Sequence, residues 1–411
     1  MHFLFLSSDR FPPFRVDVKS LFREELAGRG HRIDWLLQSA EPVRRSRVIR
    51  WGGGVAWVGR RMKGESSLAA LLNQLFGFRN DLRLFRLVRR NRYDFVQVKD
   101  KFIAALLAMI ACRRRGTRFV YWLSFPFPES HLYRAAQGYS RFPLLDRARG
   151  HLFGFLLYRV ILPAADHVFV QSEQMKLDVA AKGIPEAKLT AVPMGVALSR
   201  IPPLRSADVS SGGHKKVVYI GSLSPTRRIE FLVELFRQVV DGCPEARLYL
   251  IGGETRADIE RLERLSKELG LEEQVTISGF LPLEEAWEYV RQADVCVSPL
   301  APNPTFTPAS PTKLVEYLAF GKPVVANEHP EQREVLEKSG AGICVPFEKG
   351  PFASAILELL QDPERAADMG MRGRRYVERY RCYRVIADQV ESKYHELLSR
   401  SPEPRIGQDQ R

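Results

Sequence analysis

The sequence contains few cysteines and no apolar run long enough to cross a bilayer. Its five cysteines are scattered, odd in number and never spaced as C-x-x-C, which argues against a disulfide framework or a zinc site and favours a reducing compartment. The longest apolar stretch, residues 102–112, is too short for a transmembrane helix. The N-terminus MHFLFLSSDRFPPF has neither the basic start nor the small-residue cleavage site of a signal peptide. We therefore expect a cytoplasmic protein, either dissolved or bound to the inner face of the cytoplasmic membrane.

Acidic residues are scarce in the first half of the chain. The net charge is +14, but residues 1–200 hold 34 Lys and Arg against 16 Asp and Glu, a net charge of +18, whereas residues 201–411 carry −4. Such asymmetry predicts that the first half faces something anionic, such as a membrane surface, nucleic acid or an acidic acceptor. The alternative is that the arginines reflect a GC-rich genome. No helix-turn-helix, zinc-finger or RNP pattern is present, so we expect no nucleic-acid partner.

Short β-rich runs alternate with helical patterns along the whole chain, which predicts an α/β protein. The later runs are apolar at nearly every position, as expected for a parallel sheet covered by helices on both faces. In the second half, strands are predicted at 216–223, 247–253, 275–280, 295–300, 322–327 and 341–346. In the first half they are predicted at 2–8, 32–38, 94–100, 118–124, 167–172 and 188–193. The pattern indicates two doubly wound, Rossmann-like parallel sheets.

A segment rich in proline, glycine and serine, residues 198–214, is the predicted linker between two domains. We therefore expect a first domain over 1–198 and a second over 215–380. A C-terminal helix over 381–400 is expected to pack back on the first domain, and the polar end 401–411 to be a tail. Two such domains facing each other would form a cleft that holds two substrates.

The stretch SPTKLVEYLAFGKPVVAN, residues 310–327, places two charged residues where they look unfavourable. Ser310 and Pro311 are expected as N-cap and first residue of a helix, so Lys313 adds positive charge to an already positive helix end. Glu316 lies within an apolar run and, if buried, needs strong hydrogen-bond donors. A nucleotide diphosphate would resolve both, with phosphates at residues 310–313 and ribose hydroxyls on Glu316. The alternative is that both side chains are solvated or that Glu316 pairs with an arginine.

Four stretches together resemble one enzyme family. They are KLVEYLAFGKPVVA (313–326), VVYIGSLSPTRRIEFLVELF (217–236), FVQSEQMKLDVAAKGIPEAKLTAVPMGV (169–196) and VTISGFLPLEEAWEYVRQADVCVSP (275–299). The chain resembles the family-4 glycosyltransferases, which are retaining enzymes of GT-B fold that use nucleotide sugars. The resemblance covers nearly the whole chain and is strongest from about 167 to 347. It implies a first domain that binds the acceptor and a second that binds the nucleotide sugar.

The resemblance implies roles for residues of the second domain. Glu316 matches the ribose-binding glutamate, but the family's first glutamate falls at Pro308 and is absent. Arg227 stands at the position of a phosphate-binding lysine, with Arg228 as the fallback, and Lys313 is the second cation on the diphosphate. The remaining donor contacts are expected from Gly221, Ser222 (in place of an arginine), Gly279, Phe280, and the backbone at Ala309, Ser310, Pro311 and Thr312.

The first domain departs more from the family. The paired glycines after the first strand are missing, and Arg15 or Asp17 occupies that region. The histidine that the family places near the reacting sugar aligns with Ser124, and the nearby Glu129 and His131 receive no transferred role. Gly195 stands in the loop that passes close to the cleft in the family, preceded by Met194 instead of asparagine.

The resemblance implies transfer of a hexosyl group from a nucleotide-diphosphate sugar to a hydroxyl, with retention of configuration. No cofactor is implied, and because the sequence lacks a D-x-D pair we expect a metal-independent enzyme. The expected acceptor is a glycan or lipid-linked molecule. Residues 44–50, 112–118 and 139–166 combine arginines with apolar residues and could contact anionic lipid headgroups, unless they simply pack or are solvated. The missing motif residues leave an alternative open, a catalytically inactive GT-B binding or assembly protein.

Overall fold

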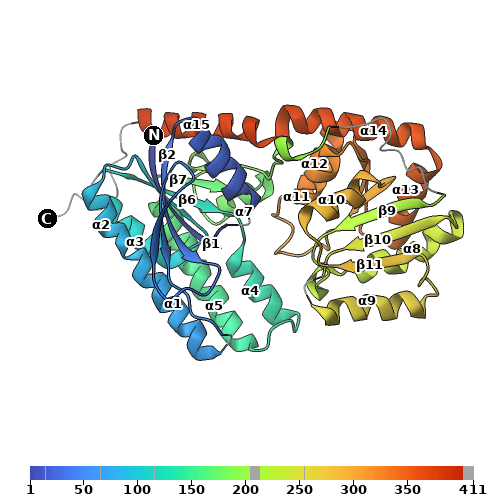
Figure 1. Ribbon diagram of the computed structural model, residues 1–411, viewed down its shortest axis with the longest axis horizontal. Helices are drawn as coiled ribbons and strands as arrows, with labels where there is room; N and C mark the ends of the chain where they lie inside the picture. The colour runs from blue at the N-terminus through green and yellow to red at the C-terminus, as the bar shows by residue number, and fades with distance from the viewer. Residues whose placement is uncertain (14, 65, 114–115, 204–212, 254, 401–411) are drawn as a thin grey trace. The chain divides into compact units, whose positions relative to one another are not determined.

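The computed structural model describes residues 1–13, 15–64, 66–113, 116–203, 213–253 and 255–400. The chain forms two compact units, the first made of Met1–Pro193 with the C-terminal helix α15 (Tyr383–Ser399), and the second of Met194–Cys382. Each unit contains one β-sheet with helices packed on it (Figure 1). Most of the expected linker, residues 204–212, and the tail 401–411 lie outside the described residues.

The sheet of the first unit has eight strands in the order β3-β4-β2-β1-β5-β6-β7-β8. All neighbouring pairs are parallel except β3 and β4. The strands are β1 (His2–Phe11), β2 (Arg32–Ser39), β3 (Arg47–Trp51), β4 (Gly54–Gly59), β5 (Phe95–Lys99), β6 (Arg118–Leu123), β7 (His167–Val170) and β8 (Leu189–Ala191). The six strands predicted in this half are confirmed.

The hairpin of strands β3 and β4 was not predicted from the sequence. Trp51 pairs with Gly54, so Gly52 and Gly53 form a two-residue loop. Both have positive φ, 57° and 79°, as this tight hairpin turn requires. The hairpin takes up most of the arginine-rich segment 44–50, which was expected to contact lipid headgroups. Two β-rich runs separated by Gly-Gly would have been the signal for it.

Helices cover both faces of this sheet. Because crossovers are right-handed, the helix between β1 and β2 lies on one face, and the helices that lead to β5, β6 and β7 lie on the other. Leu4 and Leu6 of β1 belong to a core with the latter helices, whereas Phe3 packs on Tyr394 of α15. The helical segments are η1 (Asp17–Leu26), α1 (Ser67–Asp81), α2 (Arg83–Arg90), α3 (Phe102–Arg113), α4 (Phe127–Ala136), α5 (Pro143–Phe155), η2 (Leu156–Ile161), α6 (Leu162–Ala164), α7 (Glu173–Ala181) and η3 (Glu186–Lys188).

The second unit has a six-stranded sheet in the order β11-β10-β9-β12-β13-β14, and all its neighbouring strands are parallel. The strands are β9 (Lys215–Ile220), β10 (Ala246–Ile251), β11 (Val275–Gly279), β12 (Val295–Ser298), β13 (Val324–Asn327) and β14 (Gly342–Val345). All six predicted strands are confirmed. The helical segments are η4 (Leu198–Arg200), η5 (Pro225–Arg227), α8 (Glu230–Gly242), α9 (Arg256–Glu268), α10 (Leu283–Arg291), α11 (Thr312–Ala319), α12 (Pro330–Ser339), α13 (Lys349–Gln361), α14 (Pro363–Tyr376) and η6 (Val377–Arg381).

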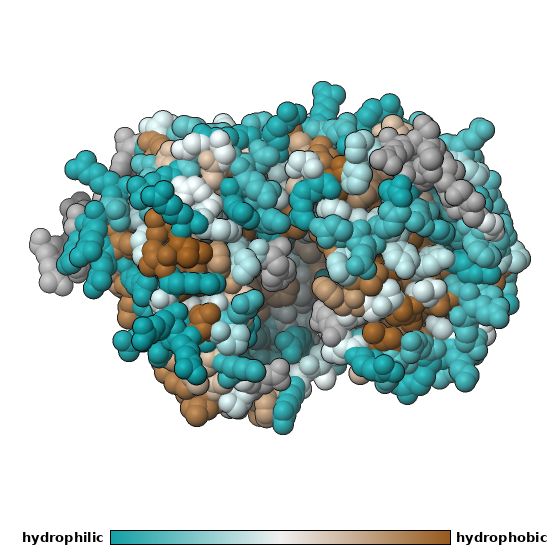
Figure 2. Space-filling model, viewed as in Figure 1, coloured by the Kyte–Doolittle hydropathy of each residue, from teal (hydrophilic) through white to brown (hydrophobic). Residues whose placement is uncertain are grey.

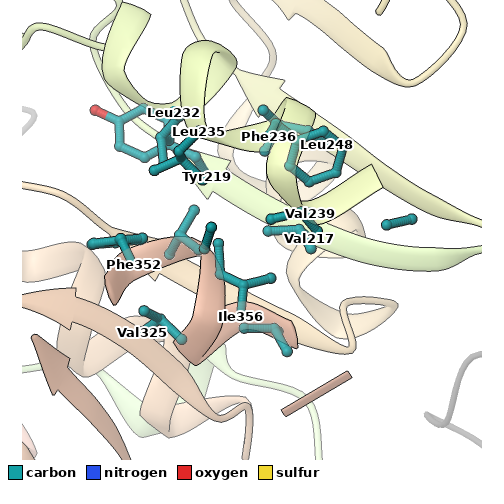
Figure 3. Close-up of a cluster of buried hydrophobic side chains, with 14 of the residues drawn as sticks. Val217, Tyr219, Leu232, Leu235, Phe236, Val239, Leu248, Val325, Phe352 and Ile356 are labelled. Carbon is teal, nitrogen blue, oxygen red and sulfur yellow. The ribbon is translucent and has the colours of Figure 1, made fainter. Parts of the chain in front are cut away.

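Strand β9 divides the core of the second unit into two layers. Figure 3 shows Val217 and Tyr219 among side chains of α8 and α13, such as Phe236 and Ile356. Val218, which points the other way, belongs to the layer that contains α10 and α11. Helix α11 is thereby held against the sheet, and its first turn is fixed near the carboxyl end of β9. Among the described residues, no helix is long and apolar enough to cross a membrane.

The docking of α15 on the first unit predicts a measurable loss of stability. Tyr394 is fully buried, and its ring lies 4.9 Å from Phe3, 4.9 Å from Phe95 and 5.2 Å from Phe169 between ring centroids. Tyr394→Ala should lower the free energy of unfolding by about 3–5 kcal/mol, because it leaves a large cavity. Urea unfolding followed by tryptophan fluorescence reports this well, since four of the five tryptophans lie in this unit.

The matched control is Leu398→Ala on the same helix, because Leu398 is 37% exposed. It should change the free energy of unfolding by only about 0.5 kcal/mol. Equal losses in both variants would contradict the packing of α15 through Tyr394.

Candidate functional site

Two glycines bring the ends of β9 and β10 into close contact. Gly221 follows β9 with a φ of 150°, and its N–H donates to the carbonyl of Ile251 at 2.9 Å. A Cβ on Gly221 would lie 2.9 Å from Nζ of Lys313, and a Cβ on Gly252 would collide with the carbonyl oxygen of Gly221. Both positions therefore require glycine. Gly221 and Lys313, both candidates from the sequence, thus lie close together, whereas Gly252 was not singled out from the sequence.

Lys313 holds a buried ammonium group with no hydrogen-bond partner among the described residues. Its Nζ lies 3.8 Å from the ring centroid of Tyr219, so a cation–π contact partly replaces lost hydration. Burial lowers the pKa of Lys313 well below its usual range, and nearby Arg227 lowers it further, while Glu316 opposes the shift. An anion placed here would gain a strong, water-shielded interaction.

Glu316 lies on the same helix, one turn after Lys313. Its carboxylate has no ion-pair or hydrogen-bond partner among the described residues, although Lys313 and Arg200 act on it at longer range. Burial raises the pKa of Glu316 to about 7, and these two cations hold it from rising further. The alternative that Glu316 pairs with an arginine is thus not realised. A carboxyl group in this state can accept hydrogen bonds from a ligand's hydroxyl groups.

The start of α11 differs from the sequence prediction. The helix begins at Thr312, Pro311 is its N-cap, and no side chain caps it within the described part of the chain. Ser310 instead accepts a hydrogen bond from the Met194 N–H at 2.9 Å and donates to Glu331 at 3.0 Å. The prediction of Ser310 as N-cap and Pro311 as first helical residue is therefore wrong. A tertiary network, in which Glu331 also pairs with Arg381, uses the hydroxyl group that local sequence assigned to the cap.

The backbone at Ala309 also differs from the expectation. Its N–H donates to the carbonyl of Phe306 at 2.8 Å, within a turn organised by the side chain of Asn303. The N–H of Ala309 is therefore engaged and does not offer a free donor. The first turn of α11, at Thr312 and Lys313, is where the uncapped helix end lies.

Arg227 lies at the end of the short turn η5, and its guanidinium carbon is 4.1 Å from the ring centroid of Phe306. Its effect on the pKa of Lys313 places it in the same electrostatic environment. Arg228 has a φ of 53° and is exposed, next to Phe347. The carbonyl of Ser222 accepts from the Tyr219 hydroxyl at 3.1 Å, which fixes the loop between β9 and η5. Arg227 is thus the better placed of the two candidate cations.

The end of β11 holds the two residues expected beside a base. Gly279 has a φ of 70°, and its carbonyl accepts from the Gly252 N–H at 3.0 Å. Phe280 follows with 82% of its surface exposed, so it is not a packing residue. An exposed phenylalanine at a sheet end offers a ring against which a planar base can stack.

The first unit contains a buried charged cluster at the ends of β1 and β5. Lys99 is fully buried, and its Nζ lies 3.1 Å from Asp9, 3.3 Å from Asp17 and 3.8 Å from Asp100. Burial alone would lower the pKa of Lys99, but Asp17 and Asp100 outweigh it and raise the pKa. Burial raises the pKa of Asp100, against the influence of Lys99. Of these residues only Asp17 was a candidate from the sequence.

Ser124 and Arg15 extend this cluster. Arg15 donates to the Ser124 hydroxyl at 3.0 Å and lies 3.5 Å from Asp9. The Ser124 hydroxyl donates to Asp100, and its N–H donates to the same carboxylate at 2.9 Å. The structure therefore brings together the sequence candidates Arg15, Asp17 and Ser124. The lysine and two further aspartates that join them were missed, because strand order, not sequence spacing, places them together.

Glu129 and His131 are held outside this cluster. Glu129 accepts from the Tyr158 hydroxyl at 3.0 Å and lies 3.8 Å from Lys182, while His131 lies 3.1 Å from Asp146. Both side chains thus join helices α4, α5 and α7 and their neighbours. These contacts hold both side chains among the helices of the first unit.

Family models match both halves of the chain. One described as "Glycosyl transferases group 1" matches residues 202–376, and one described as "Glycosyl transferase 4-like domain" matches residues 20–195. Among solved structures, the sucrose-phosphate synthase from Thermosynechococcus elongatus superposes with a TM-score of 0.74 at 20% identity, covering 98% of this chain and all of the other. Anabaena HepE in complex with UDP gives a TM-score of 0.68 at 16% identity, covering 96% of this chain and 100% of the other. These likenesses confirm the expected GT-B fold.

Curated relatives match a smaller part of the chain. A GDP-mannose-dependent alpha-(1-6)-phosphatidylinositol monomannoside mannosyltransferase from Mycolicibacterium smegmatis is 26% identical over 249 residues, which is 57% of this chain and 65% of the relative. D-inositol 3-phosphate glycosyltransferase 2 from Catenulispora acidiphila is 25% identical over 51% of both chains. The chain thus spans between about half and two thirds of the length of these relatives.

The raised pKa of Glu316 predicts that the ligand-free protein loses stability as pH rises. In the unfolded chain Glu316 titrates near the ordinary value of 4.5, but in the folded chain it keeps its proton up to about pH 7. The folded state binds more protons in this window, so the free energy of unfolding falls as pH rises through it, by on the order of 3 kcal/mol. Glu316→Gln should remove this fall, measured by urea unfolding between these pH values.

Taking the difference between wild type and Glu316→Gln cancels the contributions of titrating groups that do not interact with Glu316. The pKa of Lys313 changes together with Glu316, so the difference reports on this coupled pair. Glu285→Gln, on the exposed face of α10, is the control and should keep the wild-type slope. A difference that does not change with pH would show that Glu316 is already ionised in the folded state at low pH.

Proposed function

The chain belongs to the glycosyltransferases, with a 4-like domain followed by a group 1 domain, and from this premise we propose that it transfers a sugar from a nucleotide-diphosphate sugar to an acceptor hydroxyl. One observation carries the proposal, the buried ammonium of Lys313 at the start of α11, for which the described residues supply neither a hydrogen-bond partner nor a side-chain cap. A cation at this helix end is unfavourable unless an anion binds beside it. The diphosphate of the donor is the anion that this family supplies.

Glu316 and the end of β11 would hold the remainder of the nucleotide. A carboxylate one turn beyond Lys313 suits the two ribose hydroxyls, and the exposed ring of Phe280 suits the base. The names of similar proteins point to different bases, UDP for Anabaena HepE and GDP-mannose for the mycobacterial relative. The identity of the nucleotide base is therefore the first property of the donor to determine.

The proposed reaction keeps the configuration of the anomeric carbon. The bond from that carbon to the β-phosphate oxygen breaks, a bond to the acceptor oxygen forms on the same face, and the acceptor proton passes to the departing phosphate. No nucleophilic side chain is needed, so catalysis rests on orientation and on stabilising the leaving diphosphate. Arg227, Lys313 and the first turn of α11 would supply that stabilisation without a metal ion.

We propose a lipid-linked or polysaccharide acceptor that reaches the first unit at the inner face of the cytoplasmic membrane. The +18 charge of residues 1–200 and the phosphatidylinositol monomannoside in the name of the mycobacterial relative support this class. The cluster around Lys99 and Ser124 lies at the strand ends where an acceptor would approach. A catalytically inactive binding protein is the competing outcome, because Pro308 and Ser124 replace two family residues.

Calorimetric titration of UDP, GDP and ADP without metal tests the donor site. One nucleotide should bind the wild type, and Glu316→Ala should weaken it by about 1.5–3 kcal/mol, the usual loss for hydrogen bonds to a charged group. Glu285→Ala on α10 is the control and should bind like the wild type. If no nucleotide binds, or Glu316→Ala binds equally well, the proposed donor site is wrong.

Sugar transfer by arginine variants tests the leaving-group contact. Arg227→Ala should reduce kcat by about 10²–10³-fold, the loss typical of removing one donor that stabilises developing charge. Arg228→Ala removes the same charge one residue later and should retain most of the activity, because Arg228 is exposed and turned toward Phe347. The reverse order would reassign the role to Arg228, and the absence of turnover in the nucleotide-binding wild type would favour the inactive binding protein.

A further inference from the structure

The outer surface of helices α1, α2 and α3 exposes an unusual number of large apolar side chains. Eight of those that are exposed among the described residues lie on or between these helices, and six more lie between Tyr139 and Phe155. Figure 2 shows brown side chains among teal ones over this N-terminal part of the molecule. Isolated apolar residues on a surface are ordinary, but a contiguous set signals an interaction site.

Helix α1 carries the clearest apolar stripe. Leu68, Leu71, Leu75, Phe78 and Leu82 recur at spacings of three or four residues, and their exposed fractions are 65%, 55%, 48%, 38% and 40%. This spacing places all five on one face of the helix. The core-facing side of α1 is formed by other residues, such as the buried Ala69 and Asn80. The stripe is therefore an apolar face that stays exposed among the described residues.

Positive charge surrounds the stripe, and exposed negative charge is absent from these three helices. The only acidic residue of α1, α2 and α3 is Asp81, which is 2% exposed and paired with Lys101 at 2.6 Å. Helix α2, RLFRLVRR, contributes four arginines, among them the exposed Arg86 and Arg89. The surface is thus both apolar and purely cationic.

A groove of about 450 Å³ opens between α2 and α3 on this surface. The groove has apolar walls and two arginines. Its lining includes the apolar residues Leu82, Phe85, Ile110 and Ala111 and the arginines Arg86 and Arg89. Such a groove combines an apolar surface with guanidinium groups that bind phosphate.

We propose that the outer surface of α1, α2 and α3 binds the surface of an anionic phospholipid bilayer. The leucine stripe would enter the boundary between headgroups and acyl chains, and the arginines would contact lipid phosphates. The neighbouring helix α5 extends the same surface, because Phe153 of α5 stacks on Phe102 of α3 with ring centroids 4.8 Å apart. This surface therefore includes part of segment 139–166, for which the sequence suggested a contact with lipid headgroups. It also includes helices α1 and α2 and most of α3, for which the sequence suggested no such contact. Residues 114–115 of the expected segment 112–118 lie outside the described residues.

The charges favour a bilayer over two other occupants. A second copy of the same surface would bring arginines against arginines, which repel one another. Nucleic acid would satisfy the arginines but would leave the leucines and Phe78 in water, because it offers no apolar phase of that extent. Only a bilayer provides both negative headgroups and an apolar interior.

This inference deepens the proposed function, since it names the surface from which the protein would reach a lipid-linked acceptor, but the two can fail separately. Nucleotide binding is a property of the second unit and should be unchanged by variants of α1 and α2. Loss of nucleotide binding with intact vesicle binding would contradict the proposed function alone.

Co-sedimentation with vesicles of phosphatidylcholine containing about 30% phosphatidylglycerol tests the surface at low salt. The wild type should bind these vesicles and bind pure phosphatidylcholine weakly. Leu71→Gln with Leu75→Gln removes apolar groups at constant charge, and Arg86→Gln with Arg89→Gln removes two charges. Each pair should weaken binding by about tenfold or more, from lost burial in the first case and lost attraction in the second.

Matched controls are exposed residues elsewhere on the chain. Leu177→Gln with Leu398→Gln changes two leucines that are 56% and 37% exposed, and Arg237→Gln with Arg256→Gln removes two charges from the second unit. Both control pairs should bind vesicles like the wild type. Absence of wild-type binding, or equal binding by all variants, would overturn the proposal. A wild-type dimer that the α1 pair dissociates, without vesicle binding, would instead identify a self-interface.

Discussion

The site of the second unit depends on one constraint, a lysine ammonium held out of water with no hydrogen-bond or ion-pair partner among the described residues. Lys313 lies against Tyr219 and next to Gly221, where any larger residue would displace it. Its helix begins with a positive dipole end, and the described residues compensate the charge only through the ring of Tyr219 and the longer-range effect of Glu316. The buried ammonium is therefore electrostatically unfavourable in the free protein, and the anion proposed to bind here would relieve it. Groups fixed in advance need little reorganisation when charge develops on a leaving phosphate, which is the arrangement that favours catalysis.

A second buried lysine shows that the chain can neutralise such a charge when no ligand has to do so. Lys99 is surrounded by Asp9, Asp17 and Asp100, and its pKa is raised, whereas the pKa of Lys313 is lowered. Three carboxyl groups face Lys99 and the nearby Arg15, and burial raises the pKa of Asp100 among them. The first unit thus carries a preorganised, internally satisfied site, while the second carries one that is completed from outside. This contrast is the strongest reason to regard Lys313 as a ligand-binding residue.

The sequence predicts the sheets better than it predicts the details of the site. Apolar β-rich runs locate all twelve strands that were expected, because a parallel sheet buried on both faces leaves little ambiguity, and only the Gly52–Gly53 hairpin was missed. The unfavourable charges of Lys313 and Glu316 were visible in the sequence because Lys313 falls in the first turn of an expected helix and Glu316 lies within an apolar run. The N-cap role of Ser310 was mispredicted because a tertiary network uses its hydroxyl group, and a turn engages the N–H of Ala309. The cluster at Lys99 depends on strand order and on a positive φ of 53° at Asp100, and neither is encoded in local spacing.

The distribution of arginine distinguishes the two explanations of the basic first half. A compositional bias of the genome would scatter arginines over the surface without regard to apolar residues or to acids. In the structure, the arginines of α2 lie beside the leucine stripe of α1, and the one acidic residue of α1–α3 is buried against Lys101. By contrast, the exposed arginines of the second unit often pair with acids on the same helix, as Arg237 does with Asp241 and Arg256 with Glu260. Arginines that form no ion pair within the described part of the chain and that lie near exposed leucines therefore favour contact with a partner surface that is at once anionic and apolar.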